Sequence, residues 1–437
     1  MIVVFVSVIL DLHDEATIPL SFLKDRRRCP RMHTTICATL PSWPRRVWLP
    51  LLLVQLLAGS LSPAAAQPEF PGTPNDQGIN VRVYPADFWT PRVGPGIGAG
   101  LVVHNLARKH DQWLFTAAPA QHEQVATASF ASANPQLANQ YVLVDARALH
   151  TNRHWLGPPS DRAVLERSSL RARVRVGQTW FDRVLVQPQI TVEYHRVQDV
   201  DAPSTGTAVS APLPLPNSAK TGARLGVDLQ YDTRDQPAVT TRGVLLQGTW
   251  NRYVPLDDAG LHFDQVEIDA YGYVPLGGVH RFATRLSSTL TVNRGTAPVP
   301  VYMLPTIGGA VSPGWPRGRF VAPDRLLASV LYRFPLLHYE ELLTLEGHVG
   351  GHLAGSYDDV GNQFSTTLSF ENPPSPNEST RPLRPSVSTG LRIAMPRRQD
   401  LELAVGISPA GISAVRFSLV RTLQALRPPH HSSENVR

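Results

Sequence analysis

Cysteine, long apolar runs and signatures of catalysis are scarce in this sequence of 437 residues. The two cysteines, Cys29 and Cys37, both precede the site at which we expect an export signal to be cleaved. The mature chain therefore has no thiol, no disulfide and no cysteine-based metal site. It also has no run of about 18 apolar residues, which excludes a helical membrane protein.

Sequence motifs of enzymes and metal sites are also missing. Of the 15 histidines, 13 follow residue 66, but none belongs to an HExxH motif, and no GxSxG or phosphate-binding loop is present. His348 and His352 are four residues apart, which suits either a shared metal or two polar side chains along one strand, and we favour the second. Asp358 and Asp359 lack the spacing of an EF-hand. We expect no cofactor and no enzymatic activity, with a hydrolase in the barrel lumen as the weakest alternative.

The first 66 residues have the order of a secretory signal. Arg45 and Arg46 precede the apolar run VWLPLLLVQLLAG, and SLSPAAAQ follows, so we predict cleavage after Ala66 and export to the bacterial envelope. Met32 is a plausible true start, which would make the residues before it an artefact of start-site choice. The leader holds 7 of the 41 Lys and Arg residues and 4 of the 35 Asp and Glu residues, which leaves the mature chain at +3. We therefore expect no nucleic-acid partner.

Alternation of polar and apolar residues recurs along the mature chain in segments of about ten residues, the length of a strand that crosses a bilayer at a tilt. In GARLGVDLQYD, Leu225 and Leu229 fall on one face, while Arg224 and Asp228 fall on the other. A soluble β-sandwich also alternates. The export signal and the number of strands argue against that alternative.

Sixteen strands are expected, followed by a C-terminal tail at 423–437. Their approximate ranges are 80–90, 97–106, 111–117, 123–132, 139–149, 164–177, 181–196, 222–232, 242–253, 261–274, 279–292, 325–335, 341–353, 386–396, 400–407 and 412–422. The long gaps follow the fifth, seventh, eleventh and thirteenth strands, all odd-numbered. An outer-membrane barrel with periplasmic termini has its long external loops after odd-numbered strands. We predict an all-β, 16-stranded antiparallel transmembrane barrel over 80–422.

The alternation places many arginines on the inner face of this barrel. They are Arg171, Arg173, Arg175, Arg281, Arg285, Arg333, Arg392 and Arg416. A charge on the lipid face at mid-bilayer costs about 2–4 kcal/mol, so the register that turns them inward is well determined. They form either a charge ladder balanced by lumen carboxylates or an anion-favouring, substrate-guiding lumen.

Three segments together resemble a known family. They are GARLGVDLQYDTRDQPAVTTRGVLLQG, LPTIGGAVSPGWPRGRF and RLLASVLYRFPLL. In this order they resemble the YDxRD turn with its TxG, the GG and RG-[YF] loop, and the ExRFPL-like strand of the BamA/TamA outer-membrane assembly barrels, also called the bacterial surface antigen family. The resemblance covers roughly residues 80–422. It implies a barrel that helps polypeptide or lipid enter or cross the outer membrane.

The resemblance also implies that the sixth external loop folds into the lumen. Its motif residues would be Gly308, Gly309, Arg317, Gly318 and Phe320. Arg317 would pair there with a carboxylate from a following strand. This sequence departs from the family pattern, because Leu331 replaces the usual Glu and the usual Asp falls near His348. We expect Glu346 as the partner, with Asp324 as the other candidate, and a loop that merely projects Arg317 into solvent as the alternative.

Family members usually carry soluble POTRA domains ahead of the barrel and open sideways between the first and last strands. Here only Gln67 to Ile79 lies between the cleavage site and the first strand, so we expect no POTRA domain and a periplasmic partner that supplies docking domains. Pro85 in the first strand cannot donate a ladder hydrogen bond, which indicates a weak seam or, equally, a strand start or bulge. Outer-membrane lipid is the other expected partner. A passive anion-favouring pore is the alternative function.

Overall fold

The computed structural model describes residues 79–90, 94–104, 106, 111–133, 140–156, 163–181, 183–201, 213–235, 240–257, 260–277, 280–309, 312–316, 318–339, 343–370, 381–394, 400–409 and 411–420. The expected signal and its cleavage site, residues 67–78, Arg317 and the expected tail lie outside these ranges, so the predictions on them stay predictions.

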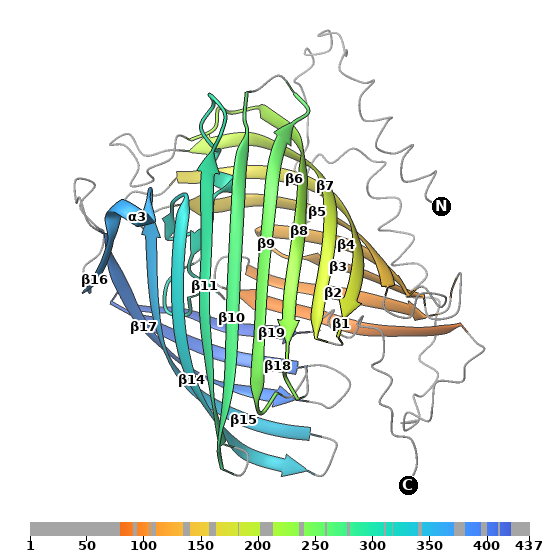
Figure 1. The fold of residues 1–437 in the computed structure, drawn as a ribbon, viewed down its shortest axis with the longest axis vertical. Helices are drawn as coiled ribbons and strands as arrows, with labels where there is room; N and C mark the ends of the chain where they lie inside the picture. Colours follow the sequence, from red (N-terminus) through yellow and green to blue (C-terminus); the bar gives the residue numbers. More distant parts are fainter. Residues whose placement is uncertain are drawn as a thin grey trace, which may run out of the picture. The chain divides into compact units, whose positions relative to one another are not determined.

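The described chain is almost entirely β-strand (Figure 1). The strands are β1 (Asn80–Thr90), β2 (Gly94–His104), β3 (Gln112–Pro119), β4 (Glu123–Ala133), β5 (Gln140–Leu156), β6 (Ala163–Trp180), β7 (Val184–Asp201), β8 (Ser218–Asp232), β9 (Gly243–Pro255), β10 (Phe263–Gly277), β11 (His280–Asn293), β12 (Thr306–Ile307), β13 (Phe320–Val321), β14 (Asp324–Tyr339), β15 (Leu343–Tyr357), β16 (Phe364–Leu368), β17 (Arg381–Ala394), β18 (Asp400–Ser408) and β19 (Gly411–Val420). Two short helices, η1 (Val301–Met303) and α3 (Val360–Gln363), lie in connections. No helix among the described residues has the length and apolarity needed to cross a membrane.

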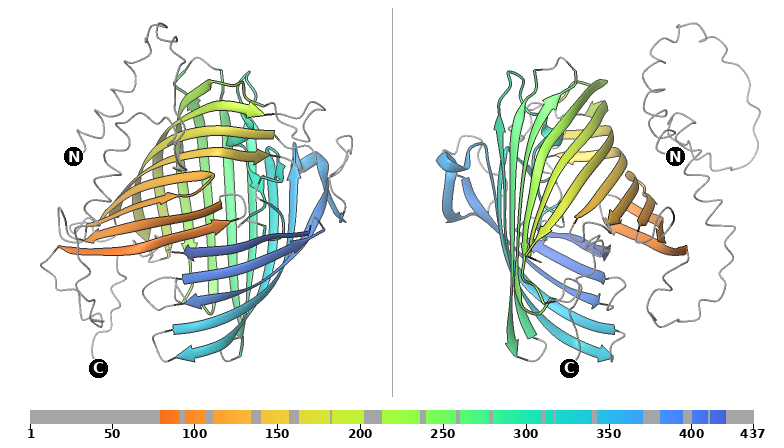
Figure 2. Two further views of the ribbon diagram at one scale, coloured as in Figure 1. Left: turned by 180° about the vertical axis from the view of Figure 1, so that it is seen from behind. Right: turned by 45° about the vertical axis from the view of Figure 1, so that its right-hand side comes forward.

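The strands form one antiparallel ring. Each pairs with its neighbour in the chain, except that β11 pairs with β14 and β15 with β17. The first and last strands, β1 and β19, also pair, which closes the sheet into a barrel (Figure 2). Of the seventeen strands in this sheet, only β16 lies outside the ring, since it adds to β17 in parallel. The predicted 16-stranded antiparallel barrel is confirmed, and closure excludes the open sandwich.

Outward and inward faces alternate as the sequence pattern predicts. Leu225, Leu229 and Ile268 are 46%, 51% and 50% exposed. Large apolar side chains are expected to be exposed in the isolated chain where they face lipid in the membrane. Inward positions such as Gln189 and Glu193 are buried instead. The period of two thus separates a lipid face from a polar lumen face on each long strand.

Strand length divides the ring into two parts. We call β5–β11, β14, β15 and β17 the long wall, where β6 and β7 have 18 residues each and β9, the shortest, has 13. We call β18, β19 and β1–β4 the short wall, where lengths run from 8 residues in β3 to 11 in β1. About 9–11 residues span a bilayer at a tilt, so the long wall extends beyond it.

The differences from the predicted ranges lie mainly at the loop ends of the long wall. β5 continues to Leu156 and β7 to Asp201, although the sequence there turns polar. The ladder continues because inward side chains at these ends, such as Leu156 and Leu165, pack on a long connection within the barrel. Tertiary packing has overridden the local polar composition, which predicted loops at these positions.

Candidate functional site

We call the connection between β11 and β14, residues 294–323, the infolded loop, because its described residues from Val299 onward pack against side chains that face the lumen. Its Trp315 is fully buried, and the side chains of Val301 and Ile307 are at most 1% exposed. Gly309 N–H donates to the Trp315 carbonyl at 2.7 Å, and β12 pairs with β13, which makes the loop a compact unit. The loop contacts lumen-facing residues of the barrel wall on two sides, as expected for a loop that folds into the lumen.

One side of the infolded loop is held by the long wall. Arg167 Nη1 donates to the Tyr302 carbonyl at 3.1 Å, and the Arg167 guanidinium lies 5.5 Å from the centre of the Tyr302 ring. His195 contacts the same ring, with centroids 5.4 Å apart. Burial raises the pKa of Tyr302 to about 12, so this phenol stays neutral. Around it, Val301 and Met303 join an apolar cluster with residues of β5, β6, β9 and β10.

The other side of the loop reaches β17 and β18, nearly half the ring away from β6. Ser386 Oγ donates to the Pro313 carbonyl at 2.6 Å. A Cβ added at Gly406 would lie only 2.0 Å from Gly314 N, and one added at Gly314 would meet the Ile407 carbonyl oxygen at 2.7 Å. The loop therefore crosses the lumen, and glycines on both elements permit the backbone approach.

The backbone conformation of the loop explains why glycine occupies three of its motif positions. Gly308, Gly309 and Gly318 have φ values of 114°, 68° and 74°, a left-handed region that side chains other than glycine rarely adopt. Phe320 is buried, and the Arg384 guanidinium of β17 lies 4.4 Å from the centre of its ring. The sequence analysis did not predict this cation–π contact, because it placed Arg384 in the gap before the strand at 386–396, whereas β17 begins at Arg381.

Glu346, the expected partner of Arg317, meets two other arginines. Arg281 Nη2 donates to Glu346 Oε1 at 2.6 Å, and Arg392 Nη1 lies 3.6 Å from Oε2. Arg281 and Glu346 are 2% and 4% exposed, so β11, β15 and β17 are joined by a buried ionic contact. Arg333 lies opposite Arg281 across the β11–β14 pair. Since Arg317 is outside the described residues, its own partner stays a prediction.

Asp324, the other candidate partner, binds backbone amides. Its Oδ1 accepts from Thr291 N–H and its Oδ2 from Val360 N–H, both at 3.0 Å. It therefore fixes the start of β14 against the end of β11 and against α3. This role needs no cation, although it leaves the predicted pairing with Arg317 open.

The remaining lumen arginines lie on the long wall, except for Arg416 on β19 of the short wall. Arg173 and Arg175 both bind Asp145 Oδ1, at 2.8 and 3.0 Å, and Arg285 binds Asp269 at 2.9 Å. Arg171 lies on the same face, two residues before Arg173, and is in register with Arg147 and Glu193. Arg392 is in register with Glu402. The backbone of Arg416 is described, in register with Ala404, while its side chain is not. Ion pairs thus neutralise part of the lumen charge, as the charge-ladder interpretation expects.

His352 lies between two serine hydroxyls, an arrangement that resembles part of a catalytic triad. Its Nε2 and Nδ1 lie 2.8 Å from Ser388 Oγ and 2.9 Å from Ser329 Oγ. A serine-type triad places a carboxylate on the second nitrogen to orient the ring, and here a hydroxyl takes that position. His348 and His352 belong to no group of three or more metal-binding side chains among the described residues.

The seam between β1 and β19 has little pairing. Among the described residues, the pairs in register across it are Phe88 with Ser418 and Trp89 with Phe417, whereas β1 pairs with β2 along its whole length. Continuing the register would place Pro85 opposite residue 421, which is outside the described residues, so the effect of this proline on the seam stays a prediction.

A closed 16-stranded barrel with a long loop crossing its lumen defines the class of protein, and comparisons assign its family. The Omp85 superfamily domain matches residues 121–419. The chain therefore belongs to the Omp85 superfamily of outer-membrane insertion and translocation barrels, as the three motif segments predicted, and its place is the bacterial outer membrane. No curated protein sequence matches the chain.

Solved structures show the same fold at low sequence identity. BamA from Haemophilus ducreyi lacking POTRA domains 1-3 has a TM-score of 0.56 and 13% identity, over 78% of this chain and 69% of that one. CdiB from Escherichia coli has a TM-score of 0.54 and 10% identity, over 80% and 62%. CdiB from Acinetobacter baumannii has 0.50 and 11%, over 78% and 60%. This chain thus spans less than two thirds of either CdiB chain.

Proposed function

We propose that this barrel assists the insertion or translocation of a polypeptide or lipid at the outer membrane, through the seam between β1 and β19. The observation that supports it is the contrast in pairing within the described part of the chain: two residue pairs at the seam against fifteen between β6 and β7. Each unformed ladder bond leaves a donor and an acceptor to be satisfied in lipid, so a poorly paired seam is the place where the ring opens at least cost.

A periplasmic partner is part of this proposal. Trp180 at the end of β6 and Phe181 in the turn after it are 53% and 88% exposed, and Phe181 has a φ of 51° that is costly for a residue other than glycine. An exposed apolar pair on a short turn suits contact with another protein at the turn end of the barrel. Co-purification with and without Phe181→Ser tests this part: the proposal requires a periplasmic protein that the substitution removes.

Cross-linking the seam tests lateral opening. Phe88→Cys with Ser418→Cys places two thiols in register across it, and the two natural cysteines lie in the leader. The purified barrel in vesicles should accelerate the folding of an unfolded outer-membrane barrel, measured as protease-protected product. Oxidation should reduce the rate to that of protein-free vesicles, and reductant should restore it.

A matched control places the same cross-link inside the long wall, as Leu170→Cys with Tyr194→Cys, which are also in register. Oxidation of this pair should leave the rate unchanged. An equal rate with the seam open or locked contradicts lateral opening. A wild-type barrel with no effect on folding contradicts insertase activity itself.

The arginine-lined lumen favours a passive anion pore as the second candidate. Such a pore requires an open path, while the infolded loop crosses the lumen between β6 and β17. A large, steady, anion-selective conductance in planar bilayers would favour the pore. A small, flickering conductance is what we expect from the loop-filled barrel.

A further inference from the structure

Two arginines on the outer surface of the long wall share one aspartate. Arg252 donates to Asp264 twice, from Nε to Oδ1 at 2.8 Å and from Nη2 to Oδ2 at 3.1 Å. Arg294 Nε donates to the same Oδ2 at 3.1 Å. The Asp264 side chain is 9% exposed, whereas those of Arg252 and Arg294 are 54% and 60% exposed. One buried carboxylate thus holds two accessible cations side by side, with a net positive charge.

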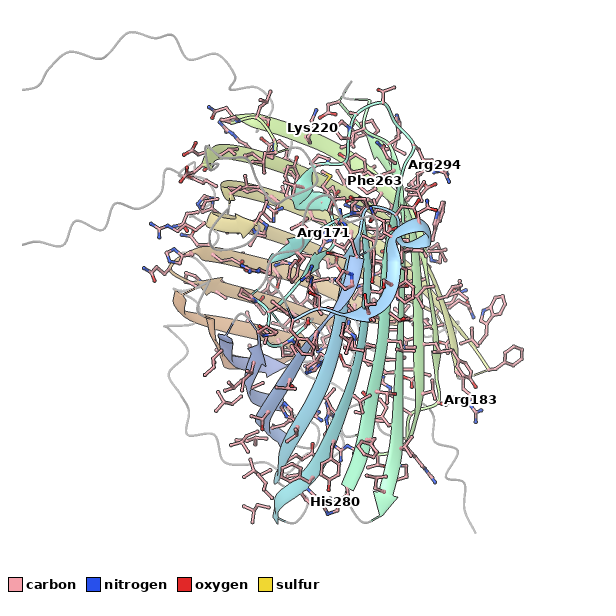
Figure 3. The ribbon with its side chains drawn as sticks, turned by 90° about the vertical axis from the view of Figure 1, so that its left-hand side faces the viewer. Arg171, Arg183, Lys220, Phe263, His280 and Arg294 are labelled. Atoms are coloured by element: carbon pink, nitrogen blue, oxygen red, sulfur yellow. The ribbon has the colours of Figure 1, made fainter. Side chains whose placement is uncertain are left out.

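This arginine pair lies at the edge of the apolar lipid-facing belt. On β9, the outward side chains that precede Arg252 include Leu246 and Trp250, which are 44% and 40% exposed. Arg252 is the next outward residue after Trp250. The Arg252 guanidinium lies 5.7 Å from the centre of the Trp250 ring. Aromatic residues mark the membrane interface of such barrels, so the pair lies where lipid headgroups begin. Figure 3 shows Arg294 at one end of the strands and His280, the first residue of β11, at the other.

The pair retains donors that a phosphate can use. A guanidinium has five N–H donors in a planar fork. Within the described part of the chain, no acceptor bonds Nη1 of Arg252 or either terminal nitrogen of Arg294. Arginine binds phosphate through two parallel N–H donors, and the two adjacent guanidinium groups present such donors side by side.

A gap in the apolar belt lies on the same strand as Arg252, on the far side of Trp250. A Cβ added at Gly248 would have no heavy atom within 4 Å. On the neighbouring strands, Leu229 and Ile268 are in register with Gly248 and are 51% and 50% exposed. The glycine therefore leaves a shallow depression between exposed apolar side chains, which suits one acyl chain.

We propose that Arg252 and Arg294, positioned by Asp264, bind the phosphate of a phosphorylated glycolipid in the outer leaflet, with one of its acyl chains lying over Gly248. The outer leaflet follows from the topology, because the pair lies at the end of the barrel where odd-numbered strands such as β9 finish. The site is independent of whether the barrel inserts, translocates or conducts its substrate.

The test is native mass spectrometry of the purified barrel with added bis-phosphorylated lipid A. The wild type should retain this lipid, and Arg252→Ala with Arg294→Ala should lower the retained fraction on the order of tenfold or more, because charge-assisted hydrogen bonds are lost. Gly248→Leu should lower retention by filling the depression. Arg183→Ala, which removes an exposed arginine at the opposite end of the barrel, should have no effect (Figure 3).

Folding is checked by the heat-dependent shift in gel mobility, since every variant compared must be folded. Equal retention of lipid A by the double variant and the wild type overturns the site. Equal retention of lipid A without its phosphates shows adhesion by the chains alone and also overturns it. Displacement by excess inorganic phosphate indicates a free-anion site, and equal retention of phosphatidylglycerol indicates no preference for the outer-leaflet lipid. Either result contradicts the assignment.

Discussion

The long wall and the short wall of this barrel differ in more than strand length. The long wall supplies the apolar cluster that holds the infolded loop and the buried contact between Arg281 and Glu346. The short wall meets the loop mainly by close backbone approach at Gly406 and contains the two-pair seam.

This difference separates two kinds of stabilisation. In the long wall, extended ladders, buried apolar side chains and ion pairs act together, and their loss should cost much free energy of unfolding. In the short wall, the contact with the loop is a close fit between backbones that depends on glycines, and the seam has few residue pairs among the described residues. A barrel that must open locally needs such a region of low stability beside a rigid one.

The largest effect is expected in the long wall for Glu346→Ala. This change leaves Arg281 buried without its carboxylate, and removing one partner of a buried ion pair costs about 3–5 kcal/mol. Urea unfolding of the barrel in vesicles measures the change in free energy. Asp269→Ala, in a more exposed pair with Arg285, is the control and should cost much less. Equal losses would mean that burial does not distinguish these pairs.

Trp315→Ala should be next in size. This fully buried side chain packs in a cluster with Phe320 of the loop and with Leu327 of β14, so its loss should cost about 3 kcal/mol and loosen the loop. We expect faster proteolysis of residues 294–323 and a larger conductance. Leu215→Ala, at a 76% exposed position, should change neither. An undisturbed loop in the Trp315 variant would contradict the docking.

Gly406→Ala should have a smaller effect, on the short-wall side of the loop. The added methyl would overlap Gly314 N, and the resulting overpacking costs about 1–3 kcal/mol. Proteolysis should increase around residues 312–316, while the part held by the long wall stays protected. Gly351→Ala, where a Cβ would meet nothing within 4 Å, is the matched control.

The smallest effect is expected for Arg381→Ala at the loop end of the long wall. Arg381 bonds to Asp358, whose side chain is 40% exposed, and exposed ion pairs contribute about 1 kcal/mol or less. The free energies of unfolding of this variant and the wild type should differ by little more than the error of the measurement. A loss comparable to that of Glu346→Ala would mean that the position of an ion pair in the wall is unimportant.

The strands were predictable because their signal is local. Alternation in stretches such as GARLGVDLQYD identifies a strand and its lipid face without knowledge of its neighbours. The elements inside the long connections, such as η1 and β16, carry no such period and were missed. The extension of β5 to Leu156 was also missed, because it depends on packing against a loop that is distant in sequence.

The candidate site was predictable only in part. Alternation places Arg281 and Glu346 on the inner face, but 65 residues separate them, and their pairing depends on the register between β11, β14 and β15. The sequence interpretation assigned Glu346 to Arg317 by resemblance. The described contacts join it to Arg281 and Arg392, and its pairing with Arg317 stays a prediction. For the arginine pair on the outer surface, Arg252 and Arg294 carry no motif, and Asp264 joins them only across strands.

Local sequence thus sets the number of strands, the lipid face of each and the glycines of the loop, because side-chain direction and backbone freedom are properties of single residues and their neighbours. The tertiary structure decides which arginine meets which carboxylate, how far the long wall extends and how weakly β1 meets β19. These depend on strand register and on the path of the loop, which bring together residues that are far apart in the chain.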